Sequence, residues 1–262
     1  MPHRLSSGVH RDAESIDQVG HHLPPVRDQT DIAKGEIAYE FVRAQVLRGE
    51  LVPGAVIPQA DVARKLGIST TPLREALRRL MTEGLVELDA HRDARVTRLT
   101  AEEARDLVEI RRSLDPLAAG LAAERRTRED LALIRETADG LRPLRTDPGS
   151  AKLLTHRRFH LAIYTASHNE LLVQSLDGLW DKADRYRRLA LEDGRTEEDL
   201  DRTHTEHLAL VDAIAAGDSR TAAAVMLAHV NASLGARAVS RLTSAAAQPV
   251  ARSLRGIRGG RA

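Results

Sequence analysis

The chain has 262 residues, 42% of them hydrophobic and 29% charged, which is enough to bury a core beneath a solvated surface; this length suits two modest domains better than one. Aromatic residues make up only 2%, so Leu, Val, Ile and Ala must fill the core, which favours helices packed on helices. The lack of cysteine excludes a disulfide scaffold, a thiolate metal site and a cysteine nucleophile, and 39 basic against 38 acidic residues leave no overall field that would attract a polyanion.

The two ends of the chain lack a helical period. We expect residues 1–33 to form a flexible arm and residues 245–262 a flexible basic tail, whose arginines either keep it soluble or bind phosphates without sequence preference. No apolar run approaches the roughly 18 residues of a membrane span, and the N-terminus has no apolar signal core. We therefore expect a cytoplasmic protein without a membrane partner.

Residues 34–98 combine short helices with a pair of strands. The apolar spacing predicts helices from about Gly35 to Arg48, from about Gln59 to Leu66, and from the start signals at residues 69–72 to about Thr82. Gly67 allows a tight left-handed turn between the second and third helices. After Gly84 the pattern predicts two short strands, residues 85–88 and 95–97, around a polar tip.

The third helix has one apolar and one polar face, and the polar face carries Arg74 and Arg78. Helix, helix, glycine turn, arginine-bearing helix and hairpin is the order of a winged helix-turn-helix, which lays its third helix in the major groove of DNA. The arginine fork can bond guanine or phosphate, although charges on an exposed helix face can also be merely solvated. The candidate DNA contacts are Ser69, Thr70, Thr71, Arg74, Arg78, His91 and Arg92.

Three segments of this region have a specific pattern: Leu51-Val52-Pro53-Gly54-Ala55, Ala63-Arg64-Lys65-Leu66-Gly67-Ile68-Ser69-Thr70-Thr71-Pro72-Leu73-Arg74-Glu75-Ala76-Leu77-Arg78-Arg79-Leu80, and Glu83-Gly84-Leu85-Val86. Over almost all of residues 34–98 the chain resembles the GntR family of bacterial transcription regulators. By this resemblance, Arg74 matches a DNA-contacting arginine. Three positions depart from the family: Thr70 and Ala60 stand at places where arginines contact DNA in other members, and Asp93 stands where the wing often has glycine.

Residues 101–243 read as one helix after another. We expect six helices, near residues 101–124, 127–143, 149–167, 170–192, 196–216 and 218–243. Thr100, Thr127 and Asp218 supply capping signals at three of the starts. The predicted fold class is therefore mainly α: an N-terminal winged helix-turn-helix followed by an all-α six-helix bundle. Bundles of this kind build ligand and metal sites between facing helices.

Four histidines fall on the apolar stripes of three of these helices. His156 and His160 are four residues apart and share one helix face, while His207 and His229 lie on the inward stripes of two later helices. Neutral imidazoles from facing helices suit Zn²⁺, with Ni²⁺ or Co²⁺ as alternatives. A single inward histidine is more often a hydrogen-bonded core residue, but four of them favour a divalent transition metal. His204 is on the edge of the same stripe as His207 and is either a supporting residue or unrelated.

Several short segments carry a second resemblance: Glu109-Ile110-Arg111-Arg112-Ser113-Leu114-Asp115, Phe159-His160, Glu206-His207, Gly217-Asp218 and Ala228-His229. They are similar to the FCD effector domain of GntR regulators, in its shorter VanR-like form, over nearly all of 101–240. The resemblance implies a metal held by an Asp and three His. His160, His207 and His229 match the histidines, and His156 falls where the Asp usually lies, which should disfavour hard ions such as Mn²⁺.

The resemblance also implies a ligand pocket. Arg111 matches an arginine near that pocket, where it could pair with an effector carboxylate; the alternative is a salt bridge within the bundle. Tyr164 is a further candidate contact to the effector.

These features together predict a metal-containing transcription regulator that responds to a small organic acid or related metabolite. We expect a homodimer on a pseudo-palindromic double-stranded operator, with repression as the family's usual mode. A regulator for which the metal ion itself is the signal remains an alternative. A bundle metalloenzyme is disfavoured, because the segment His156-Arg157-Arg158-Phe159-His160 has Arg where a zinc protease needs a general-base Glu.

Overall fold

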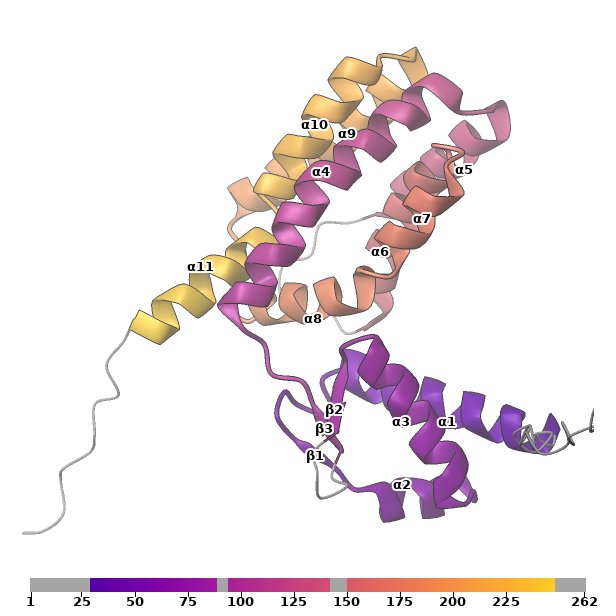
Figure 1. Cartoon of the computed structure of the whole chain (residues 1–262). Coiled ribbons are helices and arrows are strands. Elements are labelled where there is room, and N and C mark those ends of the chain that lie inside the picture. Colours follow the sequence, from indigo (N-terminus) through magenta and orange to yellow (C-terminus); the bar gives the residue numbers. More distant parts are fainter. Residues whose placement is uncertain (1–28, 89–93, 142–149, 248–262) are drawn as a thin grey trace, which may run out of the picture.

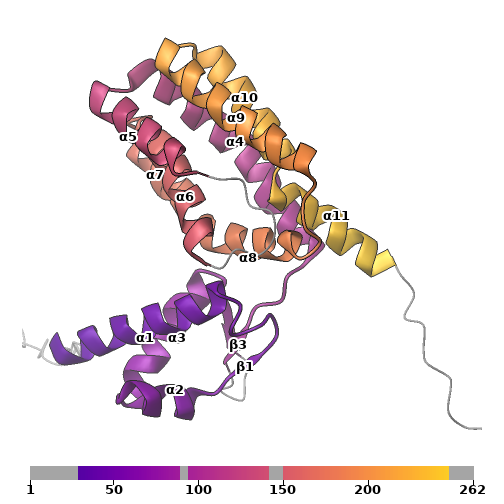
Figure 2. The ribbon, with the colours of Figure 1, turned by 180° about the vertical axis from the view of Figure 1, so that it is seen from behind.

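The structure is a computed structural model that describes residues 29–88, 94–141 and 150–247. An N-terminal head built from three helices and a small sheet lies at one end of a helical bundle (Figures 1 and 2). The predicted class, a mainly α chain with a winged helix-turn-helix followed by an all-α bundle, is confirmed.

The head contains the predicted helices and one strand that the sequence did not reveal. Its elements are α1 (Gln29–Leu47), β1 (Val56–Ile57), α2 (Gln59–Leu66), α3 (Thr70–Thr82), β2 (Val86–Leu88) and β3 (Ala94–Val96). The strands form an antiparallel sheet in the order β1-β3-β2. At two residues, β1 is too short to show an alternating pattern, and its pairing with β3 defines it. Gly67 has a φ of 64°, so the turn between α2 and α3 uses the left-handed conformation that glycine tolerates.

The start of α1 differs from the prediction. The helix begins at Gln29, inside the segment expected to be a flexible arm, and continues through Gly35. An internal glycine costs a helix only about 1 kcal/mol relative to alanine, and α1 packs along α3, which offsets this cost. The rest of the predicted arm lies outside the described residues.

The bundle consists of α4 (Ala101–Arg125), α5 (Arg128–Asp139), α6 (Ser150–Thr165), α7 (Glu170–Asp177), α8 (Trp180–Leu191), α9 (Glu197–Ala216), α10 (Ser219–Asn231) and α11 (Leu234–Ala247). The long helix α4 lies beside α10 and α9, while α5 packs on α6. Aliphatic side chains and the few aromatic rings, Phe159, Tyr164 and Trp180 among them, fill the space between these helices. The predicted source of the core is therefore correct.

Two of the six predicted helices are each broken in two. The helix expected at 170–192 stops at Gly178, where the Leu179 N–H bonds the Leu176 carbonyl three residues back, and glycine is the weakest helix former after proline. The helix expected at 218–243 breaks at Ala232 and restarts at Ser233, whose hydroxyl accepts a bond from the Ala236 N–H. If each broken helix is counted once, the described part of the bundle has the six helices that the sequence predicted.

The C-terminal helices correct two further expectations. α11 extends to Ala247, three residues into the segment expected to be a tail; the rest of that tail lies outside the described residues. By length and composition, Ser219–Ala245 is apolar enough to cross a membrane, contrary to the expectation that no stretch would be. This stretch is rich in alanine, and it folds as α10 and α11, which pack on α4 and place His229 and Val230 in the interior. A helix in a protein core can satisfy the same criterion of length and apolar composition.

α8 lies across the end of the bundle that faces the head, beside α1 in both views (Figures 1 and 2). Gly84, which ends α3 with a φ of +74°, approaches Lys182 of α8 so closely that a Cβ would lie 2.5 Å from the lysine Cε. A side chain at this position would therefore strain the backbone and force the end of the Lys182 side chain to move.

Candidate metal and ligand site

The predicted DNA contacts on the polar face of α3 are open to solvent. Arg74 and Arg78 are exposed, whereas Leu73, Leu77 and Leu80 on the opposite face are buried. Ser69, Thr70 and Thr71 are exposed at the start of the helix. The structure therefore presents these five predicted contacts on one open surface. The predicted wing-tip residues His91, Arg92 and Asp93 lie outside the described residues.

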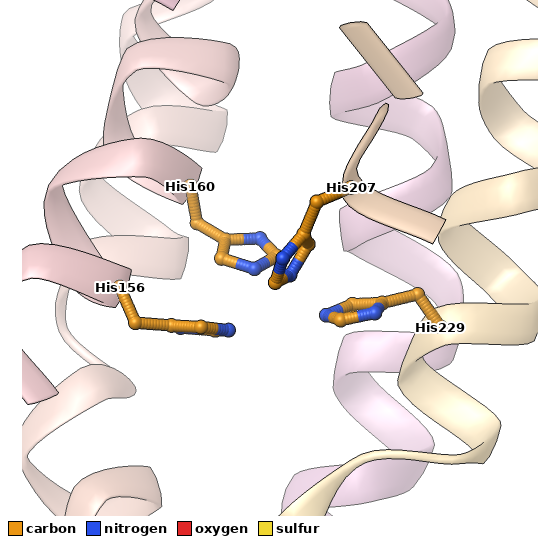
Figure 3. Close-up of side chains that lie close together, drawn as sticks. All are labelled: His156, His160, His207 and His229. Atoms are coloured by element: carbon orange, nitrogen blue, oxygen red, sulfur yellow. The ribbon is translucent and has the colours of Figure 1, made fainter. Parts of the chain in front are cut away.

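Four histidine rings converge in the bundle (Figure 3). His156 and His160 come from successive turns of α6, His207 from α9 and His229 from α10, and one ring nitrogen of each lies within 4.8 Å of those of the others. The ring centroids of His156 and His160 are 4.4 Å apart, and those of His207 and His229 are 4.7 Å apart. The four histidine side chains thus point into the bundle, as helical spacing predicted.

Several of the ring nitrogens are buried without a hydrogen-bond partner among the described residues. They are Nδ1 of His156, both nitrogens of His160, and Nε2 of His207. A buried polar atom left unpaired costs about 1–3 kcal/mol, so hydrogen-bonded core histidines do not account for this cluster. Converging nitrogen donors are what a borderline divalent ion such as Zn²⁺ requires, and the residues therefore fit the metal that the sequence predicted.

The protonation state of the cluster also suits a metal. Burial, and then the positive charge of Arg187, holds the pKa of His156 well below its ordinary value. Burial and neighbouring histidines lower the pKa of His160 and of His207 in the same direction. These rings are therefore neutral at physiological pH, which is the form that binds a metal ion.

Glu206 is a residue of this site that the sequence analysis did not single out. Its Oε2 lies 2.8 Å from Nδ1 of His229, and the two side chains are only 16% and 7% exposed. A carboxylate that accepts the Nδ1 proton leaves Nε2 as the metal ligand and fixes the orientation of the ring. His204, one turn before His207, is exposed and outside the cluster.

Arg111 belongs both to a buried ion pair and to the site. Its Nη2 donates to Oδ2 of Asp115 at 2.6 Å, and the Tyr164 hydroxyl donates to the same oxygen at 3.1 Å. Burial alone would lower the pKa of Arg111, but the Asp115 carboxylate raises it above its ordinary value. Its guanidinium also lies 4.8 Å from the centre of the Trp180 ring. The bundle salt bridge considered from the sequence therefore exists, and Tyr164 is committed to it.

A small cavity adjoins the histidines, and its lining contains three arginines and one carboxylate, that of Glu206. It has a volume of about 30 Å³ and is lined by residues that include Arg111, Arg187, Arg195, His156 and His229. Tyr164 is not among its lining residues. The guanidinium of Arg187 is paired with Asp184 at 2.6 Å, and burial lowers the pKa of Arg187. Three arginines around one cavity favour an anionic ligand.

Sequence reasoning could not have found Arg187 and Arg195, because both lie in a run of charged residues with no distinguishing spacing. Glu206 carried a signal, since it directly precedes His207, but its partner is the histidine 23 residues further along the chain.

Comparison with known proteins assigns the two regions separately. Residues 34–96 match the family described as "Bacterial regulatory proteins, gntR family", and residues 106–232 match the "FCD domain" family. The chain is 30% identical over 207 residues to the HTH-type transcriptional regulator LutR of Bacillus subtilis (strain 168), covering 71% of this chain and 92% of that protein. It is 29% identical over 209 residues to a probable D-xylose utilization operon transcriptional repressor of Paenarthrobacter nicotinovorans, covering 77% and 87%.

Solved structures share the fold. E. coli McbR/YncC superposes with a TM-score of 0.65 at 23% identity over 81% of this chain and 98% of that one. A regulator described as GntR from Rhodococcus sp. RHA1 gives a TM-score of 0.61 at 20% identity, covering 81% and 99%.

Proposed function

Because the chain belongs to the GntR family of bacterial transcription regulators and carries an FCD domain, we propose that it binds a pseudo-palindromic operator as a homodimer and that an organic acid, taken up beside a bundle metal, controls this binding. The relatives are DNA-binding transcription regulators and not enzymes. The metal part of the proposal rests above all on the buried histidine nitrogens, which have no hydrogen-bond partner among the described residues. As a regulator of operator DNA, the protein would act in the cytoplasm.

The four converging residues His156, His160, His207 and His229 would hold the metal. An all-imidazole set favours Zn²⁺, Ni²⁺ or Co²⁺ over hard, oxygen-loving ions, and the histidine at position 156 removes the negative charge that an aspartate would bring. A bound ion of this kind supplies a positive charge and, where a coordination position stays open, a binding point for a carboxylate.

The basic cavity supports an anionic effector. Arg111 and Arg187 each keep one carboxylate partner, Asp115 and Asp184 respectively, so they can orient an incoming acid without being left uncompensated when it leaves. At about 30 Å³ the cavity has room for about one water molecule. Entry of an organic acid therefore requires its lining to move, which is what a ligand-controlled regulator needs.

An apolar strip on the bundle supports the homodimer. Ile110 and Leu117 lie seven residues apart on α4 and are 44% and 49% exposed, and Leu227 on the adjoining α10 is 40% exposed. Two copies joined in this way would present two α3 helices to a two-fold operator. Relatives described as repressors favour release of DNA by the effector as the mode of control.

The DNA interface is tested by replacing Arg74 with alanine. We expect the Arg74→Ala protein to bind a duplex, enriched from random sequences by the wild-type protein, about 10- to 100-fold more weakly, because a bidentate arginine–guanine contact is worth about 1–3 kcal/mol. Affinity is measured by fluorescence anisotropy at fixed salt. Arg128→Ala, an exposed arginine at the start of α5, is the control and should bind as wild type. Equal affinity for Arg74→Ala and wild type would contradict the proposed interface.

The supporting role of Glu206 is tested with Glu206→Gln. We expect this variant to bind one zinc ion per chain with about 10- to 100-fold lower affinity, which is the usual effect of losing a carboxylate that orients a ligand histidine. Competition with a chromophoric chelator gives the affinity. Glu102→Gln, on the exposed surface of α4, serves as the matched control, and an unchanged affinity in Glu206→Gln would remove Glu206 from the site.

The small size of the cavity favours a second candidate function, in which the ion itself is the signal. Four protein ligands can satisfy a tetrahedral ion completely and leave no position for an acid. Titrating zinc first and then organic acids against DNA binding distinguishes the two functions. A metal sensor responds fully to zinc alone, whereas under the proposed function an organic acid changes the DNA affinity of the zinc-loaded chain further.

A further inference from the structure

The head rests on α8, and α8 presents different faces to the head and to the histidine site. Trp180 and Arg187, seven residues apart, lie on the face directed into the bundle. Asp181, Arg185 and Arg188 lie about 100° further round, at spacings of three and four residues. One rigid helix of twelve residues therefore touches both functional parts of the protein.

The inner face of α8 borders the histidine site. The Trp180 ring lies 6.0 Å from the ring of His156 and 5.6 Å from that of His160, measured between centroids. Arg187 lines the basic cavity. The cavity is therefore in contact with α8, through Arg187, and with α6, through His156.

The outer face of α8 holds the head. Arg185 donates to the hydroxyl and the carbonyl oxygen of Thr97, which follows β3. Arg188 Nε donates to the carbonyl oxygen of Leu47 at the end of α1, at 3.2 Å.

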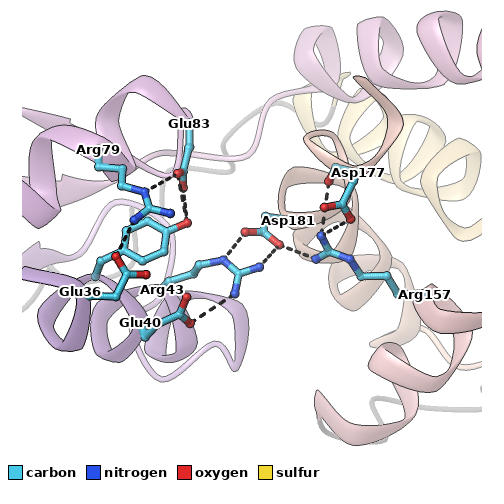
Figure 4. Close-up of polar contacts among 9 residues, drawn as sticks. Glu36, Glu40, Arg43, Arg79, Glu83, Arg157, Asp177 and Asp181 are labelled. Carbon is cyan, nitrogen blue, oxygen red and sulfur yellow. Dashed lines mark hydrogen bonds and ion pairs between the residues drawn. The ribbon is translucent and has the colours of Figure 1, made fainter. Parts of the chain in front are cut away.

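The third contact of this face is a shared carboxylate (Figure 4). Arg43 of α1 donates to both oxygens of Asp181, at 2.5 and 2.7 Å, and Arg157 of α6 donates to the same carboxylate at 2.6 Å. The side chains of Arg43, Asp181 and Arg157 are only 24%, 15% and 14% exposed. Charge-assisted bonds of this kind are strong and directional, and partial burial shields them from salt.

Arg157 directly follows His156 in the chain. Because both residues belong to one continuous helix, a displacement of His156 also displaces Arg157. Asp181 likewise follows Trp180. Two members of the ionic bridge, Arg157 and Asp181, are therefore chain neighbours of residues at the histidine site. The third member, Arg43, belongs to the DNA-binding head.

We propose that Asp181 is a positioning residue that couples occupancy of the histidine site to the position of the DNA-binding head, through its shared bridge to Arg157 and Arg43. This proposal rests on the metal site proposed above. Metal binding shifts α6 relative to α8, and this shift displaces the Asp181 carboxylate that Arg157 and Arg43 share. Because Arg43 belongs to α1, the displacement moves α1 and the rest of the DNA-binding head. The coupling is reciprocal, so DNA binding changes metal affinity by the same factor that metal changes DNA affinity.

The experiment compares the wild-type chain with Asp181→Asn, using zinc alone as the ligand and the duplex enriched by the wild-type protein. Since the chain has no cysteine, spin labels at Met81→Cys on α3 and Asp212→Cys on α9, both exposed positions, report the distance between head and bundle directly. Labelled chains are diluted into unlabelled chains so that each distance comes from one protomer.

We expect zinc to change wild-type DNA affinity at least about tenfold and to shift the label distance. Asp181→Asn should bind one zinc ion per chain, yet its DNA affinity with and without zinc should agree within twofold and its label distance should stay constant. Arg43→Gln breaks the same bridge from the head and should behave alike, which covers the case in which Asp181→Asn does not fold. Glu40→Gln removes only the longer 3.6 Å pair with Arg43 and should respond as wild type.

The outcomes separate this inference from the proposed function. If zinc binds and changes wild-type DNA affinity, and the bridge variants respond equally, the coupling role of Asp181 is wrong while the proposed function stands. If wild-type labels do not move when zinc binds, the coupling is also overturned. If the wild-type chain binds no zinc, the metal part of the proposed function fails, and the coupling fails with it.

Discussion

A chain in which His160 and His207 are both alanine should retain no transition metal, whereas the wild-type chain should carry one ion. The variant removes two of four donors from two different helices, and structural zinc sites bind with about 10–16 kcal/mol in total. Affinity should therefore fall more than about a thousandfold. Elemental analysis of the purified proteins measures the metal content. Thermal unfolding gives a second readout, since zinc raises the midpoint only of a chain that binds it.

The matched control is His204→Ala. This histidine lies on α9 one turn before His207 but is exposed and outside the cluster, so its removal should leave the metal content unchanged. The same metal content in the double variant and in wild type would refute the site.

The Asp115→Asn protein should be less stable than wild type by about 3–5 kcal/mol, the usual cost of leaving one member of a buried ion pair without its partner. Asp115 is fully buried and accepts bonds from both Arg111 and Tyr164. Burial, and then the Asp115 charge, raise the pKa of Tyr164, so its hydroxyl remains a donor. Urea denaturation of the metal-free protein measures the free energy of unfolding.

Two further variants separate a lost ion pair from a general effect of removing a carboxylate. Asp218→Asn preserves the cap of α10 and should leave the unfolding midpoint close to that of wild type, since asparagine caps as well as aspartate. Arg111→Met in the Asp115→Asn background should recover much of the loss, because an apolar replacement of a buried pair is often neutral. A single Asp115→Asn variant as stable as wild type would contradict the argument.

The DNA-binding head could be predicted closely because its signals are local. The apolar stripe of α3, the start signals at residues 69–72 and the glycine turn at Gly67 all act within one or two helical turns. The same holds for the direction of the four histidines, since helical periodicity alone places them on buried stripes. The short β1 and the breaks in two bundle helices were missed, because a two-residue strand and a kink depend on what packs against them.

The geometry of the histidine site could not be predicted from the sequence, because it depends on distances between helices that helical periodicity does not give. That four rings meet, that several of their nitrogens lack partners, and that Glu206 orients His229 all depend on how α6, α9 and α10 pack. The same applies to Arg111, for which the sequence left a salt bridge and a ligand contact open; in the structure it pairs with Asp115 and also lines the cavity.

The sequence by itself determined the family, the two-part architecture and the set of histidines, because each follows from spacings of a few residues along a single helix or turn. Only the tertiary structure decided which charges act together. Arg43 and Asp181 are 138 positions apart, and nothing in either local sequence distinguishes them from solvated residues. They pair because the packing of α1 on α8 removes both side chains from most of the surrounding water. In that less polar environment the attraction between opposite charges is stronger, and directed hydrogen bonds determine which groups pair.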